Sequence, residues 1–277
     1  MSMYMEGILT QMGVNILMAY SAYIILATGQ LSLGNAGFMA IGAFCSGYLT
    51  VRLGMPLPIA LIIAAFTSSA VGIALGIPVL RLHGFFLVLG TLGFGETVRA
   101  FFINFEPTGG AYGMRGLFGT TFEMVLITVF VVTVGLWGIE KSRIGRAFDA
   151  IASDEYAAQG IGINIRAIKV MAFGIGAFIA GLAGGLSAHH LLYIEPGNFS
   201  FLVSAMAVLF VILGGMQTFW GAMLGAIIFS LLPEVLRFMD EWRLSVYGAA
   251  LIILMILRPN GLLSRIFLRG LVVRLKR

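Results

Sequence analysis

The chain has 277 residues, of which 60% are hydrophobic and only 10% are charged, and its formal net charge is +5. Soluble domains carry about a quarter charged residues, because a water-facing surface must be covered with polar groups. The composition therefore excludes a soluble fold, indicates a chain surrounded mostly by lipid, and leaves no folded basic face that could bind nucleic acid.

Apolar segments of near-spanning length recur along the whole chain. A helix needs about 20 mostly apolar residues to cross the hydrocarbon core of a bilayer. Strands are excluded, because these segments are apolar on both faces whereas barrel strands alternate. The sequence thus predicts an all-α transmembrane bundle of about nine or ten spans, in a single domain over residues 1–277. The predicted spans are 7–28, 32–51, 58–80, 84–103, 122–139, 168–188, 200–215, 220–236 and 244–258. The segment 200–215 is short enough to be a broken or re-entrant helix.

Basic residues gather at three places and predict the orientation of the bundle. They follow the third segment at Arg81, they flank the loop 141–167, and they fill the tail 259–277. Cytoplasmic loops are enriched in Lys and Arg, and an even number of segments separates these three places, so all three can be cytoplasmic. The N-terminus and the loops 104–121 and 189–199 are then predicted to lie outside.

Small residues recur at helical spacing within the apolar segments. Such rows let a second helix dock closely, since lipid supplies no hydrophobic drive for helix association. The rows are Ala177, Gly181 and Gly185; Gly72 and Gly76; and Gly221 and Gly225. A faint echo between Gly34-x3-Phe38 and Gly215-x3-Phe219 is too slight to establish an internal repeat.

The loop 141–167 is too long for a simple connector and too polar for a span. Ser153 is placed to cap a short helix, with Asp154 and Glu155 at its positive end, and Gly160 can end it together with Gly162. Such a helix would present a compact apolar patch made of Tyr156, Ala157, Ala158 and Ile161. A displayed short helix suits insertion into a groove on a partner protein, and a helix lying on lipid headgroups explains the same pattern.

Two charged residues fall within the fourth segment. Glu96 and Arg99 are three positions apart, which places them on one face of a helix. An unpaired charge inside the membrane is costly, so the two side chains should pair or reach a watery cavity. They are candidates for a polar element of a translocation path, or for a structural salt pair that faces the bundle.

Four stretches carry a family resemblance. RIGRAFDAIASDEYAAQGIG, from Arg143 to Gly162, resembles the coupling loop of permeases in ATP-binding-cassette (ABC) importers. The others resemble the LivM-type permease of branched-chain amino-acid importers: GQLSLGNAGF at 29–38, LRLHG with TLGFGE and TGGAYG between 80 and 113, and LGGMQTFWGAMLG at 213–225. Family members often carry His where Asn35 stands, and many permeases have Ala where Tyr156 stands.

The resemblance implies a fold, a site and a set of partners. The fold would be that of an ABC importer permease in a bacterial inner membrane, crossed many times. ATPase coupling would fall on Ser153, Asp154, Glu155, Tyr156, Ala157, Ala158 and Gly160, and Asn35 would join Glu96 and Arg99 as candidates for the translocation path. The partners would be a second homologous permease, two ATPase subunits and a periplasmic substrate-binding protein.

The chain has no G-x-x-x-x-G-K-[ST] phosphate loop, so ATP is expected on a partner subunit, with no cofactor and no metal bound by this chain. Urea or amide importers use similar subunits, which leaves the substrate open. A stand-alone secondary carrier would need coupling acids near the midplane, where only Glu96 qualifies. An intramembrane enzyme would need a nucleophile–base pair or a metal cluster, and the spans offer neither.

Overall fold

The structure, a computed structural model, describes residues 3–235 and the single residues 248, 252 and 262. Apart from those single residues, the predicted segment 244–258 and the basic tail 259–277 lie outside the described part of the chain.

Ten α-helices form the described part, and eight of them coincide with predicted segments. They are α1 (Met3–Leu26), α2 (Asn35–Val51), α3 (Leu57–Val79), α4 (Phe85–Asn104), α5 (Phe122–Lys141), α6 (Arg143–Ser153), α7 (Glu155–Gly160), α8 (Ile165–Leu191), α9 (Phe201–Gly214) and α10 (Phe219–Val235). Short 3-10 turns η1 (Glu106–Thr108), η2 (Gly110–Tyr112) and η3 (Pro196–Phe199) accompany two strands, β1 (Met114–Arg115) and β2 (Tyr193–Ile194).

Five of these helices are long and apolar enough to cross a bilayer: α1, α3, α4, α5 and α8. The helices α9 and α10 reach spanning length only together, and they are bent by 115° with respect to each other. The helix α2 is shorter, at 17 residues. The described part is therefore an all-helical membrane bundle with five or six candidate spans.

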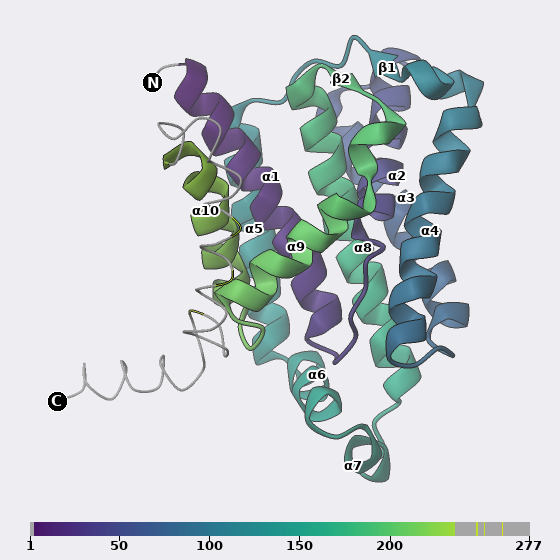
Figure 1. Ribbon diagram of the computed structural model, residues 1–277, viewed down its shortest axis with the longest axis vertical. Helices are drawn as coiled ribbons and strands as arrows, with labels where there is room; N and C mark the ends of the chain where they lie inside the picture. The colour runs from purple at the N-terminus through teal and green to yellow at the C-terminus, as the bar shows by residue number, and fades with distance from the viewer. Residues whose placement is uncertain (1–2, 236–247, 249–251, 253–261, 263–277) are drawn as a thin grey trace, which may run out of the picture.

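The two ends of the bundle carry different loops. The start of α1 lies at the end opposite α6 and α7 (Figure 1). At that same end the loops 104–121 and 189–199 meet, because β1 pairs antiparallel with β2 and sets Met114 opposite Ile194. The two loops predicted to share one side of the membrane therefore do share one end of the bundle.

Two helices begin inside the bundle rather than at its ends. Residues 27–34 leave the end of α1 through a turn and run back into the bundle, where α2 starts (Figure 1). The helix α9 likewise starts inside, after residues 192–200 descend from the outer end. The prediction of 32–51 as a full-length helical span is therefore wrong, because hydropathy counts apolar residues without locating the depth at which a helix starts.

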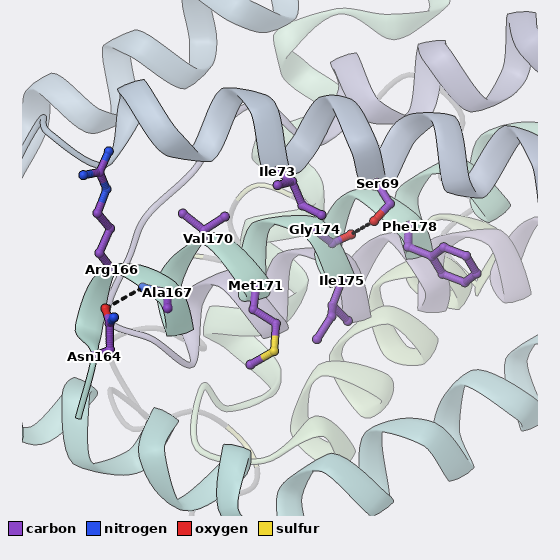
Figure 2. A pocket seen from close by; sticks show the side chains of 10 residues that line it. All are labelled: Ser69, Ile73, Asn164, Arg166, Ala167, Val170, Met171, Gly174, Ile175 and Phe178. Carbon is purple, nitrogen blue, oxygen red and sulfur yellow. Dashed lines mark hydrogen bonds between the residues drawn. The ribbon is translucent and has the colours of Figure 1, made fainter. Parts of the chain in front are cut away.

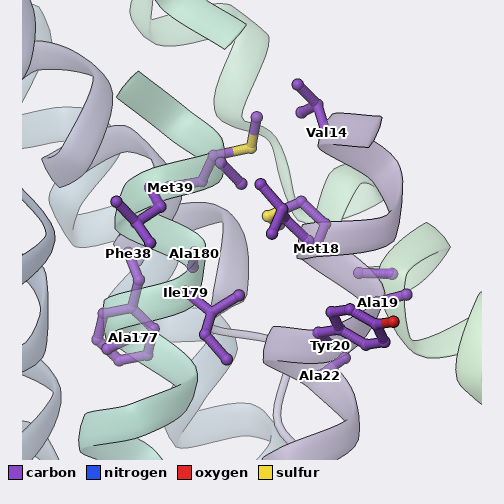
Figure 3. Packing of buried hydrophobic residues seen from close by; sticks show 14 of the residues in the cluster. Val14, Met18, Ala19, Tyr20, Ala22, Phe38, Met39, Ala177, Ile179 and Ala180 are labelled. Carbon is purple, nitrogen blue, oxygen red and sulfur yellow. The ribbon is translucent and has the colours of Figure 1, made fainter. Parts of the chain in front are cut away.

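The helix α8 forms the centre of the core. Its small residues let α2 and α3 approach closely: a Cβ added at Gly42 would overlap the carbonyl of Gly181, and one added at Gly72 would lie 2.5 Å from the Ala177 Cβ. These contacts confirm the packing role predicted for the rows of small residues. Larger apolar side chains from α1 and α2 close around the same stretch of α8 (Figure 3).

Candidate functional site

The loop predicted to hold one short helix contains two. The helix α6 is capped by Ser142, whose hydroxyl accepts hydrogen bonds from the backbone N–H groups of Ile144 (3.1 Å) and Gly145 (3.5 Å). Its apolar face buries Phe148 and Ile151, and Phe148 joins the hydrophobic core of the bundle. The helix α6 was not predicted as a separate element, although Phe148 and Ile151 stand at the i, i+3 spacing of an amphipathic helix.

The cap of α7 differs from the predicted one. Asp154 accepts hydrogen bonds from the backbone N–H groups of Tyr156 (2.8 Å) and Ala157 (3.0 Å). Ser153 is instead the last residue of α6, and its hydroxyl donates to the carbonyl of Asp149 at 2.8 Å. The predicted Ser153 cap is therefore wrong, because Ser153 belongs to the unpredicted helix α6 and Asp154 is the residue with the extended backbone of a cap.

The predicted apolar patch is only partly displayed. Tyr156 and Ile161 are 87% and 76% exposed, and Ala157 is exposed beside them. Ala158 is only 2% exposed. The prediction that Ala158 belongs to the displayed patch is therefore wrong. Ala158 follows Ala157 by one residue, or about 100° around the helix, so the two cannot face the same way.

An ion pair joins α7 to the core helix α8. The Lys169 ammonium contacts the Glu155 carboxylate, with the two side chains 12% and 44% exposed. The residues are fourteen positions apart, so no helical spacing rule reveals the pair. It ties the displayed helix α7 directly to the central helix of the bundle.

The helix α6 also touches the segment that leads into α2. A Cβ added at Gly29, which has φ +75°, would lie 3.7 Å from the Ala152 Cα. A cavity of about 710 Å³ lies at the same place, between the end of α1, α6 and the turn from α9 to α10. The helix α6 therefore lies beside the segment that leads into α2 and close to the turn that follows α9.

The two charged residues of α4 form the pair that their spacing predicts. The Arg99 guanidinium donates to the Glu96 carboxylate at 2.9 Å, and the side chains remain 36% and 40% exposed. The pair lies on a flank of α4, beside the buried face that includes Thr91 and Gly95. Asn35 is fully buried at the start of α2, so the structure does not join it with the ion pair in one site.

An open apolar groove of about 660 Å³ runs between α3 and α8 (Figure 2). Its three polar side chains already have hydrogen-bond partners. Ser69 donates to the Gly174 carbonyl, Asn164 caps α8 by accepting from Ala167, and Arg166 donates to Ile77. The groove therefore offers an apolar surface rather than polar groups that could orient a solute.

The outer end is held by Tyr193. Its hydroxyl lies 3.0 Å from the Tyr112 carbonyl and 3.2 Å from the Glu195 carboxylate, and the Arg115 guanidinium lies 5.3 Å from its ring centre. Burial raises the pKa of Tyr193, and the Glu195 carboxylate raises it further. The phenol therefore stays protonated at neutral pH and remains a hydrogen-bond donor between the two outer loops.

The described residues thus form a helical bundle with a displayed helix pair at one end, and comparison with known proteins decides the family. The family described as "Branched-chain amino acid transport system / permease component" matches residues 4–257. The chain belongs to this family. A permease component moves solute without breaking bonds and binds no cofactor itself, and its homologues place this multi-pass chain in a bacterial inner membrane.

Individual relatives agree with the family. The chain is 34% identical to the high-affinity branched-chain amino acid transport system permease protein LivM of Escherichia coli K12 over 276 residues, covering 87% of this chain and 65% of that protein. For LivM of Salmonella typhimurium the identity is 33% over 298 residues, covering 95% and 68%. The permease LivH of E. coli K12 is 31% identical over 148 residues, covering 53% and 45%. The chain thus spans about two thirds of the length of its LivM relatives, and no solved structure matches it.

Proposed function

We propose that this chain is the membrane-spanning permease subunit of an ATP-driven importer that takes up branched-chain amino acids delivered by a periplasmic binding protein. The observation that carries the proposal is the likeness to LivM proteins along most of the chain. The position of α6 and α7 supports it, because the helix pair stands at the end where an ATPase would dock.

The finer topology is a chain that crosses the membrane nine times. Six passes are the helices α1, α3, α4, α5, α8 and α10. Residues 27–34 with α2 make another, and residues 192–200 with α9 make one more. The segment 244–258 would be the ninth. This count puts the start of α1 outside and the loop 141–167 in the cytoplasm, in agreement with the basic residues.

A second, homologous permease would cover the flank of α4. The Glu96–Arg99 pair is more than a third exposed there, and a charged pair facing lipid is costly. A protein surface or a water-filled path between two permeases removes that cost. The partial likeness to LivH supports a partner of the same family rather than an unrelated protein.

Coupling to two ATPase subunits would use the displayed side of α7 and the body of α6. Tyr156, Ala157 and Ile161 would enter a groove on the ATPase, as a short helix with exposed apolar side chains can. Motion would then pass to α8 through the Glu155–Lys169 pair, and toward α2 through the contact of α6 with Gly29.

One glycine allows a clean test of this coupling. A Cβ at Gly160 would meet nothing within 4 Å, so Gly160→Arg adds a bulky charge to α7 without disturbing the fold. We expect leucine uptake and stimulation of the ATPase to fall at least about tenfold in reconstituted vesicles, with the pair of permeases still assembled. The matched control is Gly7→Arg at the opposite end, which also has open space and should leave uptake unchanged.

Purification in mild detergent, with mass spectrometry of co-purifying chains, tests the assembly directly. Recovery of ATPases and a second permease supports the proposal, and uptake of leucine rather than urea or amides separates the two importer classes. Recovery of this chain alone, in a form that moves solute without ATP, would favour a secondary carrier instead.

A further inference from the structure

Two parts of the chain have the same plan in opposite directions. In the first part, α1 leads into residues 27–34, which re-enter the bundle before α2 and then α3 (Figure 1). In the second part, α8 leads into residues 192–200, which re-enter from the other end before α9 and then α10. Inverted repeats with discontinuous helices often place the solute site of a transporter where the helices are broken.

The first turns of the two half-length helices meet. The backbone N–H of Ala36, in the first turn of α2, donates to the Ser204 hydroxyl in the first turn of α9 at 2.8 Å. Neither helix start has a side-chain cap: Gly34 offers none to α2, and Ser200 makes no capping hydrogen bond to α9. The Ala36 N–H is used in this contact, and the N–H groups of Gly37 and Val203 bond the carbonyls of Gly34 and Ser200. The start of a helix carries a partial positive charge, so two positive ends meet at this junction.

A buried side chain at this junction has no partner. Asn35 opens α2 and is 0% exposed, and neither its amide nitrogen nor its amide oxygen makes a hydrogen bond within the described residues. Leaving such a group unpaired in a buried place destabilises the fold, because its hydrogen bonds to water are lost without replacement. A purely structural position would be better filled by an apolar residue of similar size, so the amide at Asn35 points to a ligand.

A cavity adjoins the junction on its outer side. It measures about 360 Å³ and lies between α1, α8 and α9. Its wall includes Met39, one helical turn after Asn35 on the same face of α2, and Val203, next to Ser204 on α9. Most of the lining is apolar, and Asn15, Ser187 and Asn198 add polar groups. The volume and lining suit an aliphatic side chain on a small polar molecule.

We propose that the junction of α2 and α9, with Asn35, binds the carboxylate of the transported amino acid, while its aliphatic side chain occupies the adjoining cavity. This rests on the proposed function and names the site within it. The two helix starts supply N–H donors and positive charge, and the Asn35 amide supplies one further donor. Separation of α9 from α2 opens the junction, and α6 contacts the segment leading to α2 at Gly29.

The test introduces a fixed carboxylate. Asn35→Asp is nearly isosteric and would satisfy the two positive helix ends in place of the ligand. In the complete importer in proteoliposomes, we expect the variant to assemble, to melt at a higher temperature, and to lose leucine uptake at least tenfold. Asn35→Leu should also assemble, with the KM for uptake raised at least tenfold, because the donor is lost. The control Ser46→Ala lies on the same helix, where the hydroxyl bonds only its own backbone, and should transport normally.

Each outcome bears on the proposal. Normal uptake by Asn35→Asp overturns the proposal. Failure of that variant to assemble also overturns it, because the junction would then not accommodate a carboxylate. Replacing chloride with gluconate separates the two sources of negative charge: uptake by the native importer that depends on chloride assigns the junction to an inorganic anion and overturns the proposal. If the native importer takes up no branched-chain amino acid, the proposed function itself fails, which is a distinguishable result.

Discussion

The helices α8 and α5 are both long and apolar, but α8 is mostly buried within the chain and α5 is mostly exposed. In its most apolar stretch α8 is 78% buried within the chain, whereas α5 is 17% buried. The difference follows from side-chain size: α8 carries rows of Gly and Ala that admit neighbouring backbones, and α5 presents large side chains such as Phe130 and Val131 outward. In a membrane, burial within a chain is thus decided by small residues and not by hydrophobicity, which the two helices share.

The helix α4 is an intermediate case. Its stretch is 28% buried, close to α5, yet it carries the exposed Glu96–Arg99 pair on one flank. The helix α5 has charged residues only near its ends, at Glu123, Glu140 and Lys141. The exposed flank of α4 therefore differs from the exposed face of α5 in carrying an ion pair.

The largest effect should come from filling the core row of α8. A Cβ at Gly184 would overlap the Met39 carbonyl, so Gly184→Leu must push α2 away. We expect a loss of about 3 kcal/mol or more, seen as failure to yield monodisperse protein in detergent. The control is Gly135→Leu on α5, where a Cβ meets nothing within 4 Å, and normal yield is expected. Equal yields from the two variants would contradict the comparison.

A smaller effect should come from breaking the pair on α4. Glu96→Leu leaves Arg99 alone, and a lone charge in the membrane costs about 2.5–3.5 kcal/mol. We expect weaker co-purification of the second permease and a lower melting temperature. Adding Arg99→Leu should restore the melting temperature but not the association, if the flank faces a partner. Restoration of both would mean that the pair is only a neutral element facing the chain's own bundle or lipid.

The smallest effect should come from the start of α8, where it contacts α7. Lys169→Met removes the contact with Glu155, which is 44% exposed, so the expected loss of stability is under about 1 kcal/mol. Because the pair is proposed to transmit motion, ATP hydrolysis per leucine imported should rise a few-fold. An unchanged ratio of hydrolysis to uptake would show that the pair only holds α7 in place.

The sequence predicted some features of the candidate site correctly and others wrongly. The loop 141–167 was located, its closing Gly162 has the expected positive φ of 87°, and the Glu96–Arg99 contact followed from spacing. The Ser153 cap and the display of Ala158 were wrong, because both depend on where α6 ends, and one residue turns every later side chain by about 100°. The contact of α6 with Gly29 joins distant segments, so no local pattern contains it.

The sequence by itself determined the membrane class, most of the helical segments within the described residues and the close-packing rows. These depend on hydropathy, charge and periodicity, which are properties of neighbouring residues. Only the tertiary structure decided that α2 and α9 are half-length, that their first turns meet at Ala36 and Ser204, and that Asn35 is buried without a partner. The depth at which a helix starts and the hydrogen bonds that its residues make depend on segments distant in the sequence. Those segments come together only when the helices pack.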